Sequence, residues 1–257
     1  MSVRIIESPL ARPQNRHGTA VSATAHLDTF PPVLMAAFGE RWFEDGCLSL
    51  VFRSVTDHCD PVRAGLVVDD TGVAAASLVT PEGVVVADGT AGVGLEAARS
   101  NFPALLGEDT RTIATALVHC PSIAQSRRIV DGLIASPIEW YHGPSPWGPS
   151  VTAPSSVIEM FSQVAEAHLT SDTVGVITAL EIRYHGEPIV CDTEYAVEGH
   201  LATVDGPPDH DVLMCDMTAS DEQGYVVASA RVLAEFPRAA TPGPRGDRSR
   251  ATVPTRE

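Results

Sequence analysis

A histidine and a glutamate in one stretch of the chain, "YHGPSPWGPSVTAPSSVIEMFSQVAEA" from Tyr141 to Ala167, have types and spacing that could support chemistry. His142 lies in a loop rich in proline and glycine, and Glu159 lies near the start of the apolar run that follows. An imidazole and a carboxyl group can exchange protons with a substrate near neutral pH. The stretch therefore has two interpretations: an active-site loop leading into a catalytic helix, or a turn leading into a core helix.

The other reactive side chains do not suggest a metal or cofactor site. The five cysteines are scattered without a CxxC pair, which argues against structural zinc or a disulfide framework. "DHCD" (57–60) and "HC" (119–120) adjoin apolar runs, where cysteine is usually buried. No GxSxG, HExxH or Walker A motif is present, and no GxGxxG motif occurs in a strand–helix setting. We therefore expect no metal and no cofactor.

The charge of the chain limits its partners. The net charge is −16 and every basic residue is arginine, which excludes a Schiff base formed by a lysine of the chain. Residues 1–237 contain 12 arginines and 31 acids, a net charge of −19. Such a surface does not favour nucleic acid, and it repels anionic carriers except where arginines are grouped, as at Arg127 and Arg128.

Helical spacing divides the run after Pro154 into two stripes. The apolar stripe consists of Val157, Phe161, Val164, Ala165 and His168, and the polar stripe consists of Ser155, Glu159, Ser162, Gln163 and Glu166. The pattern predicts an amphipathic helix, with Glu159 either on a solvated face or facing a pocket.

A weak internal repeat relates the two halves of the sequence. An "HG" pair at 17–18 precedes a helical run at 30–42 and four strand-like runs, and an "HG" pair at 142–143 precedes the helical run at 153–167 and four more. Hairpin turns are predicted at "PEG" and "DEQG". An additional helix is predicted at 121–133. We expect one unit over residues 1–108, a second over 109–237, and a disordered tail over 238–257.

One helix followed by antiparallel strands is stable when the sheet curls around the helix and buries it. Two such units can merge their sheets through edge pairing, which also hides the strand edges. The sequence therefore predicts an α+β fold in which each helix is wrapped by part of a continuous sheet.

This arrangement resembles the double hotdog proteins found among MaoC-like hydratases and polyketide-synthase dehydratases. "WGPSVTAPSSVIEMFSQVA" (147–165) is similar to the entry into the hotdog helix of MaoC-like proteins, and "GEPIVCDT" (186–193) is similar to their PV-x-x-G-D-T strand, echoed by "DPVRAGLVV" (60–68). The Asp-x-Asn-Pro-x-His run of MaoC-like hydratases is absent. Its place reads "SPIEWYHGPSPWGP", with a histidine but without the Asp and Asn.

The resemblance implies a site around the second helix. Related dehydratases pair a loop histidine with a carboxylate on the hotdog helix, which assigns His142 as base and Glu159 as acid or water-positioning group. The first half has Ala37 where the second has Glu159, so one active and one degenerate unit are expected. A backbone N–H at the helix N-terminus would polarise the thioester carbonyl. The expected substrate-binding residues are Tyr141, Trp147, Ser155, Ser156 and Gln163.

The resemblance leaves three functions open. The first is dehydration or hydration of a 3-hydroxyacyl or enoyl thioester bound to coenzyme A or a carrier protein, including polyketide-derived substrates. The second is an acyl thioesterase in which Glu159 activates water. The third is a non-catalytic or cyclisation-promoting ligand-binding protein. The sequence has no signal peptide or membrane-spanning run, so we expect a cytoplasmic protein, and the resemblance suggests a homodimer.

Overall fold

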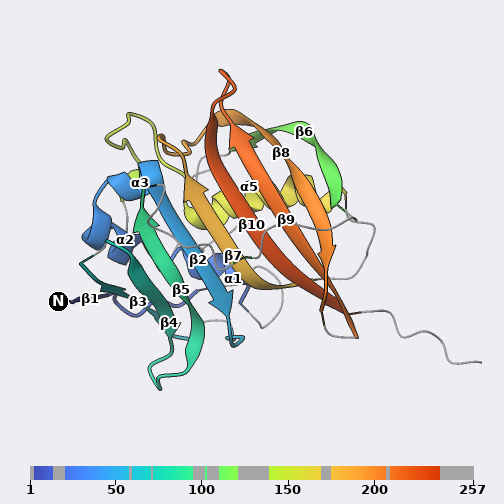
Figure 1. Cartoon of the computed structure of the whole chain (residues 1–257). Coiled ribbons are helices and arrows are strands. Elements are labelled where there is room, and N and C mark those ends of the chain that lie inside the picture. Colours follow the sequence, from blue (N-terminus) through green and yellow to red (C-terminus); the bar gives the residue numbers. More distant parts are fainter. Residues whose placement is uncertain are drawn as a thin grey trace, which may run out of the picture.

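Antiparallel strands dominate the chain and form one large sheet (Figure 1). The structure is a computed structural model, and it describes residues 3–13, 21–57, 60–70, 72–94, 102, 110–120, 139–168, 175–206 and 209–237.

The elements follow one another in two similar series. The first contains β1 (Arg4–Glu7), α1 (Ala23–Leu27), α2 (Pro31–Phe38), α3 (Arg41–Asp45), β2 (Gly46–Phe52), β3 (Arg63–Val68), β4 (Ala74–Val79) and β5 (Val85–Val93). The second contains β6 (Thr110–Cys120), the short 3-10 helix η1 (Glu139–Tyr141), α5 (Pro154–Glu166), β7 (Val176–Tyr184), β8 (Thr193–Val204), β9 (His210–Ser220) and β10 (Val226–Pro237).

The strand order shows that the two series are structural repeats. The described strands form a 10-stranded sheet in the order β1-β3-β4-β5-β2-β7-β10-β9-β8-β6. Read outward from the centre, each half has the same order: the second strand of its series, then the fifth, fourth, third and first. The halves meet where β2 pairs antiparallel with β7, from Cys47 opposite Arg183 to Val51 opposite Ala179. The repeat predicted from the sequence is therefore present.

The two predicted hairpin turns have the same geometry. Between β4 and β5, the N–H of Gly83 donates to the carbonyl of Thr80, and Gly83 has a φ of 85°. Between β9 and β10, the N–H of Gly224 donates to the carbonyl of Asp221, and Gly224 also has a φ of 85°. Glycine adopts this left-handed conformation without the steric cost that a side chain imposes.

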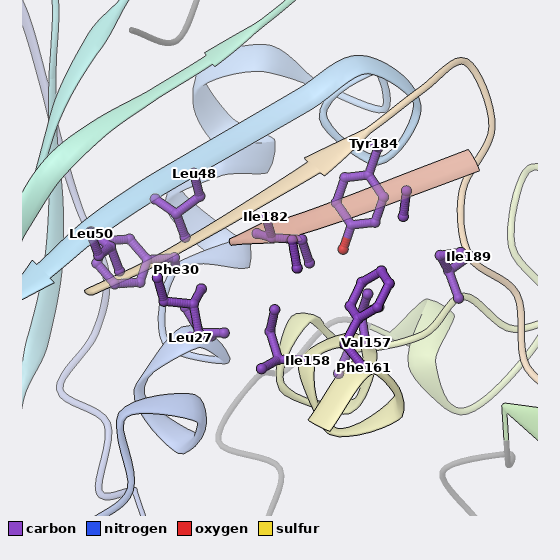
Figure 2. Packing of buried hydrophobic residues seen from close by; sticks show 14 of the residues in the cluster. Leu27, Phe30, Leu48, Leu50, Val157, Ile158, Phe161, Ile182, Tyr184 and Ile189 are labelled. Atoms are coloured by element: carbon purple, nitrogen blue, oxygen red, sulfur yellow. The ribbon is translucent and has the colours of Figure 1, made fainter. Parts of the chain in front are cut away.

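The helices lie on one face of the sheet, which Figure 1 shows from the opposite side. α5 begins at Pro154, a favoured first residue of a helix, and buries Val157, Ile158, Phe161 and Val164 against the sheet. One cluster of buried side chains extends from the first series to the second (Figure 2). The predicted apolar stripe of α5 is therefore confirmed at its central positions.

The helical run of the first half differs from the prediction. Instead of one helix over 30–42, the chain forms α2 and α3, separated at Gly39, whose φ is 67°. The edge strands β1 and β6 and the short helix α1 were not predicted. The predicted helix at 121–133, the tail at 238–257, His17 and the expected unit boundary at 108–109 lie outside the described residues.

Candidate active site

The loop before α5 is fixed to the segment before β8. Val151 forms an isolated bridge with Val190, and the N–H of Thr152 donates to the carbonyl of Ile189 at 2.8 Å. The N–H of Cys191 donates to the carbonyl of Ser150, also at 2.8 Å. The two segments that resemble MaoC-like proteins, 147–165 and 186–193, therefore lie side by side.

Trp147 connects this loop to the first half of the chain. Its Nε1–H donates to Oε1 of Glu44 in α3 at 3.0 Å, and its ring packs edge-on against Phe43 and Trp140 with centroid distances of 6.0 and 5.8 Å. The ring is half-buried. These contacts account for the position of Trp147, and its expected contact with substrate stays a prediction.

The polar stripe of α5 remains at the surface. Glu159 and Gln163 are exposed, and Ser155 and Ser156 are half-buried. The opposite side of α5 is buried in the core. Glu159 thus projects from a helix that is otherwise packed against the sheet.

His142 is also exposed. It follows η1, and its backbone N–H donates to the carbonyl of Glu139 at 2.9 Å. The helical pattern left Glu159 either on a solvated face or facing a pocket, and in the structure Glu159 and His142 are both exposed. Their joint action stays a prediction.

A buried carboxyl group that the sequence analysis did not select lies at the N-terminus of α5. Asp28, in the turn after α1, is 3% exposed. Its Oδ1 accepts a hydrogen bond from the Ser155 N–H at 3.0 Å, and its Oδ2 accepts one from the Ser155 hydroxyl at 2.6 Å. The N-cap residue of α5, Ala153, provides no side-chain cap, so Asp28 caps α5 from the other half of the chain.

Burial raises the pKa of Asp28 to about 6, because the loss of hydration outweighs the two hydrogen bonds from Ser155, which lower it. A carboxyl group that titrates in this range can either take or give a proton near neutral pH. Whether Asp28 transfers a proton to a substrate depends on whether the side chains around it leave room for the reacting group.

The capping by Asp28 corrects one expectation. The N–H of Ser155 is bound to Asp28, and the N–H groups of Ser156 and Val157 donate to the carbonyl of Ala153 at 3.0 and 3.1 Å. The prediction that a backbone N–H at this helix terminus polarises a thioester carbonyl is therefore wrong for these three groups, since each already has an acceptor.

Two buried tyrosines lie near Asp28. Tyr141 is 1% exposed and Tyr184 is 3% exposed, and neither hydroxyl has a hydrogen-bond partner among the described residues. The pKa of each is raised, first by burial and then by the nearby charge of Asp28. Figure 2 shows the Tyr184 hydroxyl pointing from β7 toward α5. Tyr141, predicted to bind substrate, is thus a buried residue.

The signal for Asp28 in the sequence was present but ambiguous. It lies in "HLDTFPPV", three residues before the proline that begins α2. An aspartate in this position is typical of a helix cap, but the sequence suggests a cap for α2, which follows it directly. Only the tertiary structure shows that the capped helix is α5.

The nearby thiol of Cys120 does not have the properties of a nucleophile. Cys120 and Cys191 flank Thr152, whose hydroxyl lies 3.2 Å from the Cys120 sulfur and 3.6 Å from the Cys191 sulfur. Burial raises the pKa of Cys120 to about 12, so its reactive thiolate form is scarce near neutral pH. Within the described ranges, no three His, Cys, Asp or Glu side chains converge as ligands of a metal ion would.

The opposite face of the sheet has a separate, polar pocket. Its lining includes Glu181 and Arg183 of β7, which point away from the core residues Leu180, Ile182 and Tyr184. Asp216 and Arg231 complete its charged wall, joined by a 3.0 Å ion pair. This pocket contains none of the predicted site residues. Among the described helices, none has the length and apolar character to cross a membrane.

The fold has counterparts among solved structures. A structure named as a MaoC domain dehydratase from Chloroflexus aurantiacus matches 86% of this chain and 83% of its own, with a TM-score of 0.58 and 12% identity. One named as a thioesterase II from Thermobifida fusca matches 90% of this chain and 96% of its own, with a TM-score of 0.50 and 16% identity. The dehydratase domain of PpsC from Mycobacterium tuberculosis, solved with C12:1-CoA, matches 91% of this chain and 94% of its own, with a TM-score of 0.51 and 12% identity.

No family model matches the sequence, and no curated protein sequence matches it. The structural matches confirm the fold predicted from the repeat and from the two short motifs: an α+β double hotdog. Because fold and function are separable, the activity has to be argued from the side chains.

Proposed function

We propose that this chain is an enzyme that hydrates or dehydrates acyl thioesters, with a 3-hydroxyacyl or enoyl group carried by coenzyme A or a carrier protein as substrate. One observation supports the proposal most: α5, the helix packed against the sheet of the double hotdog, carries a carboxylate, Glu159, near the end into which the loop with His142 leads. The similarity to dehydratases of this fold supports the same reaction class.

In the dehydration direction, the imidazole of His142 takes the proton from the carbon next to the thioester carbonyl. The carboxyl group of Glu159 gives a proton to the hydroxyl on the next carbon, which leaves as water. The products are the enoyl thioester and water, and hydration is the reverse. In this proposal Gln163, one turn after Glu159 on the exposed stripe, holds the same substrate. The aromatic rings around Trp147 form a rigid support for the loop that carries His142.

The test compares Glu159→Gln and His142→Ala in an assay of water addition to enoyl-CoA substrates of increasing length. Each change is expected to lower kcat about 10²–10⁴-fold, which is the usual contribution of a positioned acid or base. Glu166→Gln, an exposed acid on the same helix, and His200→Ala, an exposed histidine on β8, are the matched controls and should leave kcat unchanged. Full activity in Glu159→Gln would refute this role for the carboxylate.

Thioester hydrolysis is the second candidate, because the exposed Glu159 is accessible to water and a thioesterase II structure shares the fold. A carboxylate alone can then orient or deprotonate the attacking water. Release of free coenzyme A that falls with Glu159→Gln but not with His142→Ala would favour hydrolysis over dehydration. Ligand binding without turnover, unchanged by either substitution, would favour the non-catalytic or cyclisation-promoting alternative.

A further inference from the structure

The junction between the halves contains more polar groups than its internal hydrogen bonds satisfy. Asp28 comes from the turn after α1, Tyr141 from η1 and Tyr184 from the end of β7, and all three are at least nine-tenths buried. The ring of Phe43 contacts both tyrosine rings, at centroid distances of 6.1 and 6.5 Å. Segments distant in sequence thus bring the two tyrosines together around Phe43, and the charge of Asp28 acts on the pKa of both hydroxyls.

The hydrogen bonds of these side chains can be counted. Within the described residues, the Tyr141 and Tyr184 hydroxyls have no partner, although each can donate one hydrogen bond and accept others. Among the residues that the structure describes, Asp28 receives hydrogen bonds from Ser155 alone, whereas an ionised carboxylate offers about four acceptor sites. Donor and acceptor capacity therefore remains on the same buried cluster.

Some other buried hydroxyls among the described residues have partners. Tyr195, which is also 3% exposed, accepts a hydrogen bond from the N–H of Val190 at 3.0 Å. Thr152 lies within 3.2 Å of the Cys120 sulfur. Folded proteins rarely leave buried polar groups without a partner, and clusters of such groups often mark a place for water or a ligand. The Thr29 hydroxyl, next to Asp28 in the chain, and the Trp42 Nε1–H, whose ring packs against Tyr184, also lack a partner among the described residues, so the unsatisfied groups gather in one region.

We propose that Asp28, Tyr141 and Tyr184 form a polar recess that receives a hydroxyl group on the acyl portion of the substrate, with water in its place when no substrate is bound. A hydroxyl group fits because it can donate to the Asp28 carboxylate and accept from a tyrosine at the same time. A methylene group can do neither, so it would leave the cluster unsatisfied. The recess therefore selects hydroxylated acyl chains over their saturated counterparts.

The position of the recess relates it to the proposed active site. Ser155, which binds Asp28, lies one helical turn before Glu159, so the two sites share one end of α5. An acyl chain that passes Glu159 toward the N-terminus of α5 would reach the recess. This inference rests on the proposed function for its substrate, but its polar groups can be tested without any reaction.

The test measures the binding of two unreactive probes, the N-ethylamides of 7-hydroxyoctanoic acid and of octanoic acid, by titration calorimetry. The hydroxyl is placed near the end of the chain because a hydroxyl on the third carbon would lie at Glu159 instead. The wild-type protein should bind the hydroxylated amide about tenfold more tightly, as one or two buried hydrogen bonds allow. Tyr141→Phe and Tyr184→Phe should each remove most of this preference and leave the affinity for the octanoic amide unchanged. Tyr195→Phe, a buried tyrosine whose hydroxyl already has a partner, should keep the preference.

Two outcomes would overturn the proposal: equal affinity of the wild-type protein for both amides, or a preference that survives in both Tyr→Phe variants. A selective binder that turns over no thioester would support the recess and refute the proposed reaction. An enzyme that turns over thioesters but binds both amides equally would support the proposed reaction and refute the recess. Since Tyr→Phe keeps the ring and its packing, the melting temperature of each variant checks that it is folded before it is titrated.

Discussion

At the scale of single residues, two buried titratable side chains of the first half oppose each other in their effect on stability. Burial raises the pKa of Asp28 from 3.8 to about 6, and burial lowers the pKa of His26 from 6.5 to about 4. His26 lies beside the Thr56 hydroxyl, with its Nε2 at 3.0 Å. Asp28 thus favours the folded state while it is protonated, and His26 favours the folded state while it is neutral.

The sign of each contribution follows from the pKa values. The stabilising effect of Asp28 is complete below pH 3.8 and is lost as the pH rises through about 6. The stabilising effect of His26 is complete above pH 6.5 and is lost as the pH falls through about 4. Between about pH 4 and 6, one contribution falls while the other rises, and they largely cancel in the wild-type protein.

Substitution of either residue should therefore reveal the pH dependence of stability that the other residue masks in the wild-type protein. We predict that the free energy of unfolding of Asp28→Asn, relative to wild type, rises by about 1.4 kcal/mol per pH unit over this range, and that of His26→Gln falls by a similar amount. Urea unfolding at half-unit steps of pH measures both. If the free energy of unfolding of both variants changes with pH in the same way as that of the wild type, the two groups do not have these shifted pKa values.

At the scale of elements, the two hairpin turns are a test of the structural repeat. Gly83 and Gly224 have the same positive φ, and an added Cβ at either position would meet no other atom, so an alanine would cost only backbone strain. We predict that Gly83→Ala and Gly224→Ala each lower the free energy of unfolding by about 1–2 kcal/mol.

The control for this prediction is Gly143→Ala, because an added Cβ there makes only an ordinary contact with the Glu139 carbonyl and the backbone lies outside the left-handed region. Its stability should change by about 0.5 kcal/mol or less. The two turns lie at opposite ends of the sheet in Figure 1, so the double variant should show the sum of the two losses. A large loss at only one turn would contradict the equivalence of the two hairpins.

The elements also show what the sequence could and could not predict. α5 and the glycine-containing turns carry strong local signals: an amphipathic period after a proline, and a glycine at a fixed turn position. β1 is short and mostly exposed, so it lacks the alternation that identifies a strand. Asp28 could not be selected, because its role depends on Ser155, 127 residues later in the chain. Local patterns were enough to predict the repeat, whereas the place of Asp28 at the N-terminus of α5 depends on tertiary contacts.

At the scale of the whole molecule, the two halves share contacts that should make them unfold together. β2 pairs with β7, Asp28 caps α5, and Glu44 binds Trp147, so the second half depends on the first for a strand partner, a helix cap and a loop anchor. A single buried cluster extends across the junction. These contacts predict one cooperative transition rather than two.

The junction can be tested at Leu50, which is fully buried on β2 opposite Leu180 of β7. Leu50→Ala removes packing shared by both halves and should lower the free energy of unfolding by about 2–5 kcal/mol. Leu117→Ala is the control, since Leu117 is 73% exposed and should change little. Tryptophan fluorescence, which reports on the junction rings, and far-ultraviolet circular dichroism, which reports on the sheet, should give coincident transitions in all variants. If Leu50→Ala instead separates the two signals into successive transitions, the halves are independently stable and the shared contacts do not couple them.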